Sequence, residues 1–208
     1  IAPFDIQEAA FLLKNTFFHF PAGTIHLVSV HAERRNPTKC LIIEFKDHFF
    51  VGIDNGLFAL LFEDQPTKII EVPQKQEINS SFIAKDVLCD IVGDLLAGKS
   101  MNNLGNPLNA IETKTYLRPP DNAFMMRANI VYIDRFGNLI INITKERFEQ
   151  SRKGRSFIIN YKRNEELREI SETYGDVPEG ERLCLFNASG YLETVSYTHL
   201  TLPTSDLV

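Results

Sequence analysis

Hydrophobic residues near the beginning of the chain recur at helical spacing and then give way to strand-like runs. The helical set precedes residue 14 and consists of Ile6, Ala9, Ala10 and Leu13. Asp5 stands before this set and Glu8 three positions later, which is typical of a capped helix start. Residues 40–45 and 48–53 are rich in β-forming side chains and are separated by two residues that suit a tight turn. The pattern therefore predicts a helix followed by a hairpin.

Further along, the pattern predicts a second helix and then a change of character. Residues 24–30 alternate loosely and predict a strand, whereas residues 85–97 follow helical spacing up to Gly98, a suitable helix stop. Residues 101–123 contain Asn, Gly and three Pro with weak periodicity, so we place the domain boundary there. Beyond it, short β-rich runs and one short helix after Thr144 predict a small β-rich domain.

Composition and charge narrow the possible functions. The 208 residues carry 22 Lys plus Arg against 27 Asp plus Glu, a formal net charge of −5, so no basic field favours nucleic acid. The apolar runs are far shorter than the roughly 18 residues that a membrane span needs, so no membrane partner is expected. The three cysteines are odd in number and widely spaced, which favours free thiols in the cytoplasm.

One segment matches the letters of a phosphate-binding loop. Residues 93–100 read GDLLAGKS, which fits the pattern GxxxxGK[ST]. Such a loop must leave a strand and open a helix, whereas Gly93 lies inside the predicted helix and Gly98 ends it. A phosphotransferase using Gly93 to Ser100 is therefore an alternative that the pattern disfavours. The five histidines and three cysteines show no metal-ligand spacing, so we expect no metal site.

Two segments combine an acid, an Asn and a Gly directly after a predicted strand. They are Asp54-Asn55-Gly56 and the DRFGN run from Asp134 to Asn138. Turns of this composition usually bond their own backbone, but they also place a carboxylate and an amide where an ammonium or hydroxyl group could bind. Both interpretations are open at this stage.

Taken together, these segments resemble one enzyme family. The similarity covers about residues 1–195 in the same order, and its motifs lie at residues 4–13, 21–26, 54–56, 134–143 and 187–193. The chain resembles the S-adenosylmethionine (SAM) hydroxide adenosyltransferases, relatives of the fluorinase and chlorinase. This resemblance implies an α/β fold in which an N-terminal α/β domain with a central sheet, residues 1–115, precedes a smaller C-terminal β-barrel domain, residues 116–195.

The resemblance also implies a reaction and a set of binding residues. Water or hydroxide would displace methionine at the ribose C5′ of SAM, without metal or cofactor, in a homotrimer that binds SAM between subunits. Asp134 would pair with the methionine ammonium, Phe136 would pack beside the substrate and Asn138 would bond its polar atoms. Family members often have Ser after the Asn of the last motif; here that position is Ala188, which leaves Ser189 as the candidate.

The chain departs from the hydrolytic members at the residues that orient water. Their Asp-Arg-His set is replaced at two positions, by His31 where Asp is expected and by Ile83 where His is expected. Arg34 or Arg35 matches the remaining member, and we assign Arg35 and His31 as catalytic candidates. Two hypotheses follow, a SAM hydrolase-like enzyme and a catalytically impaired paralogue that binds SAM or adenosine.

The ends of the chain differ from the family pattern as well. The family opens with a strand and an Asp-Phe-Gly segment that holds the ribose, and we expect this first strand to be missing here. Residues 196–208 have no apolar period that would suit a closing barrel strand, so we expect a tail that is not native to the fold.

Overall fold

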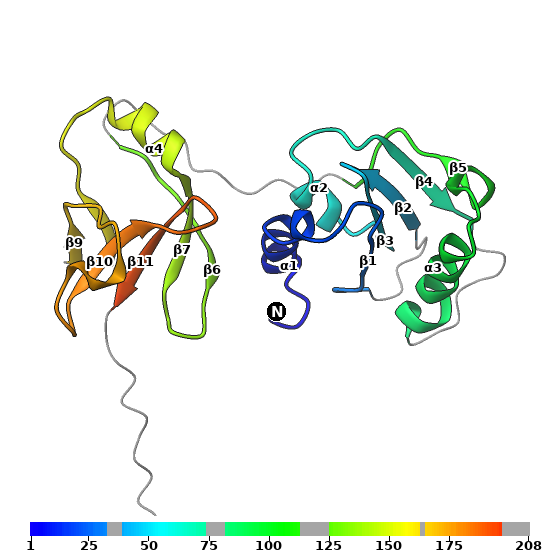
Figure 1. Ribbon diagram of the computed structural model, residues 1–208, viewed down its shortest axis with the longest axis horizontal. Coiled ribbons are helices and arrows are strands. Elements are labelled where there is room, and N and C mark those ends of the chain that lie inside the picture. The colour runs from blue at the N-terminus through cyan, green and yellow to red at the C-terminus, as the bar shows by residue number, and fades with distance from the viewer. Residues whose placement is uncertain (33–38, 74–81, 113–124, 163–164, 197–208) are drawn as a thin grey trace, which may run out of the picture. The chain divides into compact units, whose positions relative to one another are not determined.

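The computed structural model describes residues 1–32, 39–73, 82–112, 125–162 and 165–196. The chain divides into two compact units, residues 1–116 and 117–208 (Figure 1). No helix within the described ranges is long and apolar enough to cross a membrane.

The first unit is built on a five-stranded sheet with the order β1-β3-β2-β4-β5. Its strands are β1 (Ile25–Val28), β2 (Cys40–Phe45), β3 (His48–Ile53), β4 (Lys68–Val72) and β5 (Asn106–Pro107). The predicted hairpin is confirmed: β2 and β3 pair antiparallel, and Lys46 and Asp47 both have positive φ, as a tight hairpin turn requires. In contrast, β1 pairs with β3 in parallel, so the carboxyl ends of these two strands lie side by side.

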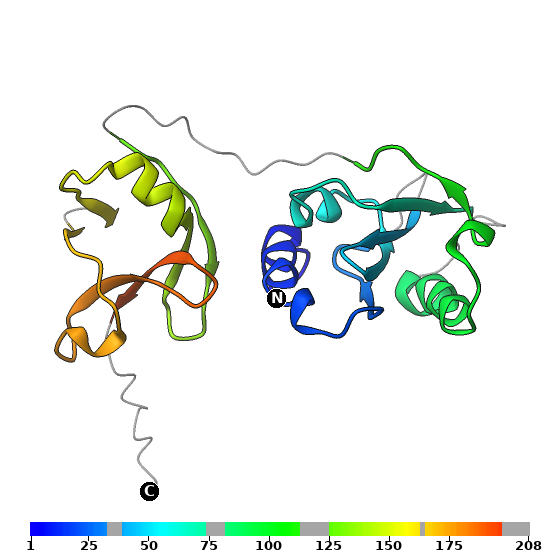
Figure 2. The same ribbon diagram turned by 45° about the horizontal axis from the view of Figure 1, so that its top comes forward.

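Helices cover both faces of this sheet. They are α1 (Ile6–Lys14), the short η1 (Phe17–His19), α2 (Leu57–Leu61), the π-helical turn η2 (Ala84–Leu88), α3 (Cys89–Leu96) and η3 (Met101–Asn103). Alternate residues of β2 point to opposite sides, so that Leu41 and Ile43 pack with α1 and α2, whereas Ile42 packs with α3. Figure 2 shows α1 and α2 on one side of the sheet and α3 on the other.

Of the two capping interactions predicted for α1, the one from Asp5 is confirmed and the one from Glu8 is wrong. The Asp5 carboxylate accepts hydrogen bonds from the backbone N–H groups of Gln7 and Glu8, each at 2.9 Å. Glu8, however, accepts from the backbone N–H of Ala2 rather than from that of Asp5. The Asp5 N–H is already bonded to the carbonyl of Ala2, so Glu8 instead ties the preceding segment to the helix.

The second unit contains a four-stranded sheet with the order β10-β11-β7-β6 and a separate two-stranded ribbon. The strands are β6 (Ile130–Ile133), β7 (Leu139–Thr144), β10 (Arg182–Phe186) and β11 (Tyr191–Ser196), with β8 (Ile159–Lys162) and β9 (Glu165–Leu167) in the ribbon. The predicted helix after Thr144 is α4 (Lys145–Arg152), capped by the Thr144 hydroxyl; η4 (Tyr174–Asp176) is a short turn. Mixed α/β architecture is thus confirmed, and closure of the second unit into a barrel stays a prediction.

The structure shows that the phosphate-loop interpretation is wrong. Gly93 lies inside α3, residues 83–92 immediately before it are helical, and Gly98 ends the helix with a φ of +82°. Lys99, which would hold a phosphate, forms an ion pair with Asp94 at 2.7 Å. Backbone N–H groups therefore do not converge on an anion here, because they form the hydrogen bonds of the helix.

The three cysteines are free thiols in two different environments. Cys40 and Cys184 are fully buried, and burial raises the pKa of each thiol to about 11. Cys89, at the start of α3, is exposed.

Two histidines meet in an aromatic cluster at the amino ends of β1 and β3. His26 Nε2 lies 3.2 Å from His48 Nδ1. The ring of Phe50 stacks on His26 with centroids 4.8 Å apart, and Phe17 contacts both imidazoles edge-on. Burial, and secondarily the neighbouring His48, lower the pKa of His26.

We expect this pair to make the fold less stable in acid. Because the pKa of His26 is lower in the folded chain than in the unfolded chain, its stabilising effect is complete above pH 6.5. As the pH falls below that value, His26 binds a proton more readily in the unfolded chain than in the folded chain, so the free energy of unfolding decreases. Urea unfolding at about pH 7.5 and about pH 5.5 measures this, and His26→Gln is expected to reduce the difference.

The exposed His19 provides the matched control. His19→Gln should leave the difference between the two pH values as it is in the unmodified chain. An equal pH dependence in the unmodified chain and His26→Gln would contradict this explanation.

Candidate functional site

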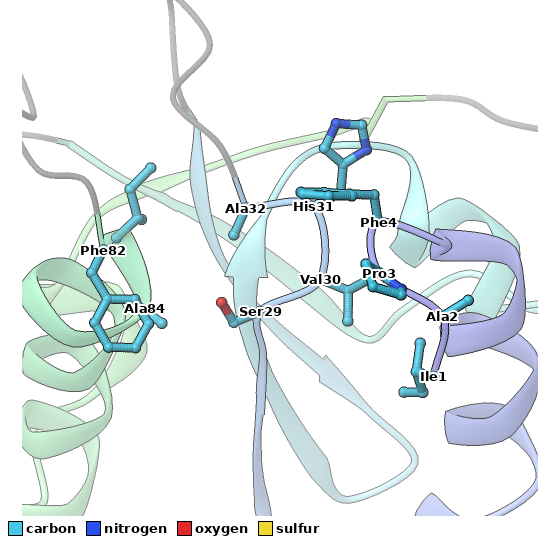
Figure 3. Close-up of a pocket in the computed structure, with 11 residues that line it drawn as sticks. Ile1, Ala2, Pro3, Phe4, Ser29, Val30, His31, Ala32, Phe82 and Ala84 are labelled. Atoms are coloured by element: carbon cyan, nitrogen blue, oxygen red, sulfur yellow. The ribbon is translucent and has the colours of Figure 1, made fainter.

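A cavity of about 390 Å³ lies beside the carboxyl end of β1. Three segments line it: residues 1–4 before α1, residues 29–32 after β1, and residues 82–84 at the start of η2 (Figure 3). Because β1 and β3 are parallel, their carboxyl ends open on the same edge of the sheet, which is where ligands bind in many α/β folds. The parallel pair therefore explains why a pocket forms at this place.

The pocket brings together two of the positions singled out from the sequence. His31 lines it from the loop after β1, and Ile83, with 3% of its surface exposed, lines it from the start of η2. Among the described lining residues, His31 alone has an ionisable side chain. Arg34 and Arg35, the remaining candidates for the water-orienting set, lie outside the described residues.

The pocket walls are mainly apolar, with a few polar groups. Phe4 and Phe82 line the pocket and are each 59% exposed, and in Figure 3 the Ser29 hydroxyl points toward the side where Phe82 lies. The Phe4 ring contacts the His31 imidazole edge-on, with centroids 5.6 Å apart. Exposed aromatic rings and a mainly apolar wall suit a flat, largely apolar group such as a heteroaromatic base.

The Asp54-Asn55-Gly56 segment has a structural role in this unit. Asp54 accepts two hydrogen bonds from the backbone N–H of Glu112, at 2.8 and 3.0 Å, and burial raises the pKa of its carboxyl group. Asn55 is 2% exposed. Its side-chain amide donates to the Val30 carbonyl, and its side-chain oxygen accepts from the backbone N–H of Leu57. Of the two interpretations of this turn, the structure supports the one in which its side chains bond the protein's own backbone.

In the second unit, the loop from Asp134 to Asn138 joins β6 to β7 and is folded around one carboxylate. Asp134 Oδ1 accepts from the backbone N–H groups of Phe136 and Asn138, at 2.8 and 2.9 Å. Its Oδ2 accepts from the Asn138 side-chain amide at 2.9 Å. This arrangement keeps Asn138 buried and leaves Phe136 exposed, with the Arg135 guanidinium 4.8 Å from the centre of its ring. Three of the predicted binding residues therefore lie together.

Ser189 is not among them. It lies in the turn between β10 and β11, and the strand register places this turn beside Thr144, whereas Asp134 lies beyond Leu139. These positions are at opposite ends of β7. Ser189 is exposed, and its backbone N–H donates to Asn187 Oδ1 at 3.0 Å.

A buried carboxylate from the motif at residues 187–193, to which the sequence analysis assigned no role, lies beside β7 between those two ends. Glu193, 4% exposed, accepts from Asn187 Nδ2 and from the Tyr174 hydroxyl, each at 3.1 Å. Burial, the charge of Glu193 with its hydrogen bond, and the charge of Asp134 raise the pKa of Tyr174 to about 12. Tyr174 is therefore bonded to Glu193 and lies close enough to Asp134 for that charge to affect its pKa. The available sequence signal was an acid in a β-rich run that also contains the apolar Leu192 and Val195.

Within the described parts of both units, no group of three or more His, Cys, Asp or Glu side chains could hold a metal ion.

Comparison with known proteins gives matches along most of the chain. Residues 1–105 match the SAM hydroxide adenosyltransferase N-terminal domain, and residues 128–197 match the SAM hydroxide adenosyltransferase C-terminal domain. The (R)-S-adenosyl-L-methionine hydrolase of Methanocaldococcus jannaschii is 29% identical over 151 residues, which are 70% of this chain and 52% of that protein. The match thus spans about half the length of this relative.

Two solved structures share the fold. A crystal structure of an uncharacterized conserved protein from Thermotoga maritima superposes with a TM-score of 0.81 and 23% identity, covering 95% of this chain and 78% of that one. A conserved hypothetical protein from Thermus thermophilus superposes with a TM-score of 0.68 and 21% identity, covering 94% of this chain and 75% of that one. Both confirm the α/β architecture.

Proposed function

Because the chain belongs to the SAM hydroxide adenosyltransferase family, we propose that it is a SAM hydrolase-like protein that converts SAM and water to adenosine and L-methionine. The observation that supports this most directly is the pocket at the carboxyl end of β1. It contains His31 and Ile83, the two positions at which the family resemblance expects water-orienting residues. The similarity to a SAM hydrolase points to the same ligand.

The proposed reaction is a displacement at the ribose C5′. The oxygen of water forms a bond to C5′ while the C5′–S bond breaks, and its electron pair returns to sulfur to give the neutral thioether of methionine. The water loses a proton, and the His31 imidazole is the acceptor that the pocket offers. A sulfonium is already a good leaving group, so we propose that no metal or cofactor takes part. Positioning and desolvation of the water molecule lower the activation barrier of this step.

We further propose roles for the remaining candidate residues. Asp134 would pair with the methionine ammonium, Phe136 would pack beside the ligand, and Asn138 would bond its polar atoms. The partial exposure of Asp134 and the exposed ring of Phe136 support these roles. Ser189 and Arg35 stay candidates for substrate binding and catalysis, respectively.

A second candidate function is binding without turnover. Ile83 supplies a buried alkyl group where the hydrolytic members have an imidazole, so the water-orienting set is incomplete. General acid–base help is worth about 10²–10⁴ in rate, and a chain without it would retain SAM or adenosine rather than convert it.

The assembly and location are proposals as well. The family resemblance favours a homotrimer with SAM bound between subunits, which sedimentation velocity would test directly. The three free cysteines favour the cytoplasm, where thiols stay reduced.

Incubation of the full chain with SAM separates the two functions. Chromatography that follows adenosine, together with calorimetry of SAM binding, is the measurement. Saturable release of adenosine supports the hydrolase, and saturable binding without adenosine supports the binding protein. If SAM neither binds nor reacts, both proposals are wrong.

A further inference from the structure

The side chain of Asn55 is buried against the loop that carries His31. Its Nδ2 donates to the Val30 carbonyl at 2.9 Å and to the His31 carbonyl at 3.2 Å. Its Oδ1 accepts from the backbone N–H of Leu57 at 3.1 Å. With 2% of its surface exposed, Asn55 thus has both its amide N–H groups and its oxygen bonded inside the protein.

These bonds join two elements that are distant in the sequence. Asn55 follows β3, and Gly56, with a φ of +88°, turns the chain into α2. His31 follows β1, the parallel neighbour of β3. The Asn55 amide therefore connects the loop after β1 to the first turn of α2.

The backbone of His31 has an uncommon conformation that such bonds can stabilise. Its φ of +51° is in the left-handed region, which residues other than glycine adopt in only a few per cent of cases. The Val30 carbonyl belongs to the peptide group before the His31 Cα, and the His31 carbonyl belongs to the one after it. Because Asn55 bonds both peptide groups, it restrains both φ and ψ of His31.

We propose that Asn55 is a positioning residue that holds His31 in its left-handed conformation and thereby fixes the imidazole at the pocket. The catalytic part of this inference rests on the proposed function, since it concerns His31 as the proton acceptor. The conformational part does not depend on it. A side chain that only began α2 would need the bond to Leu57 and neither of the two donated bonds.

Asn55→Asp tests the donated bonds selectively, since it keeps an acceptor for the Leu57 N–H and removes both donors. Asn55→Ala removes all three bonds and serves as the second variant should the carboxylate prevent folding. Asn15→Asp is the matched control, because the side-chain amide of Asn15, which follows α1, also donates to a backbone carbonyl, that of Phe11.

The first readout is the conformation of His31 in solution, measured by NMR on the full chain. A strong nuclear Overhauser effect between the amide proton and Hα of the same residue marks a positive φ. We expect this signal at His31 in the unmodified chain and in Asn15→Asp, and its loss in both Asn55 variants. Its persistence in the Asn55 variants would overturn the proposal, whether or not the chain hydrolyses SAM.

The second readout is a double-mutant cycle on adenosine release. We expect Asn55→Asp to lower kcat about 10- to 100-fold, as a misplaced catalytic group does, with KM changed far less. In a His31→Gly background, where glycine adopts the positive φ freely, the same substitution should not lower kcat further. An equal loss in both backgrounds would overturn the catalytic part. If the unmodified chain releases no adenosine but the Asn55 variants lose the Overhauser effect at His31, the positioning role of Asn55 is confirmed and the hydrolase function is refuted.

Discussion

Replacing His31 with Asp and Ile83 with His in the same chain is expected to raise the rate of adenosine release from SAM about 10²- to 10⁴-fold. The two positions line one pocket, and the expected gain depends on the introduced carboxylate and imidazole orienting one water molecule there, as the family resemblance implies. Asp is among the few residues that tolerate the positive φ of position 31. At position 83 the imidazole replaces an alkyl group of similar size that already forms part of the pocket wall.

The single substitutions provide the controls for this experiment. Residues that act as a unit are strongly non-additive, so each single variant should gain far less than the pair. His31→Asn with Ile83→His keeps the shape but lacks both the carboxylate and the original His31 imidazole, and we expect it to release adenosine far more slowly than the double variant. A double variant that binds SAM normally and releases adenosine no faster would contradict the assignment of these positions.

Asp134→Ala is expected to weaken SAM binding roughly 10- to 150-fold, which corresponds to the 1.5–3 kcal/mol of a hydrogen bond to a charged group. The substitution removes the proposed partner of the methionine ammonium. It also removes the acceptor of three hydrogen bonds that fold the loop around Asn138. Calorimetric titration with SAM measures the combined effect.

Asp134→Asn separates the two contributions. Its carbonyl oxygen can still accept from the backbone N–H groups of Phe136 and Asn138, so two of the three loop hydrogen bonds are kept, while the charge and the bond from the Asn138 side-chain amide are lost. We expect this variant to bind SAM weakly but to bind adenosine, which has no ammonium, as the unmodified chain does. Unchanged SAM affinity in Asp134→Asn would show that the carboxylate serves the loop alone.

The elements that the sequence predicted best are those specified by local chemistry. Asp5 caps α1, two turn residues with positive φ close the hairpin of β2 and β3, and Thr144 caps α4. Each depends on side chains within a few residues of one another. The helix over residues 85–97 was also correctly predicted, apart from the π-helical turn that begins it.

Pairing between distant strands was beyond such reasoning. Nothing in residues 25–28 indicates that they pair in parallel with residues 48–53, and nothing in the short β4 indicates that it pairs with both β2 and β5. The pocket follows from that parallel pair, so its place could not be derived from local pattern. Family resemblance identified His31 and Ile83, and the fold then brought them together.

The candidate site in the second unit illustrates the same limit. The DRFGN segment was recognisable as a unit because its five residues bond one another locally. Glu193 was part of the motif at residues 187–193, but its contact with Tyr174 was missed, since the two residues are 19 positions apart and meet only through the fold. Ser189 was grouped with Asp134 by resemblance, and the register puts them at opposite ends of β7.

The contrast between the three thiols has a practical consequence for following ligand entry. Alkylating fluorophores react with accessible thiolates, so Cys40 and Cys184, both buried with a pKa of about 11, should stay unlabelled in the native chain. Cys89 would carry a single dye on the helix whose preceding turn forms one wall of the pocket. The emission of that dye would then report occupancy by SAM and adenosine without any engineered cysteine.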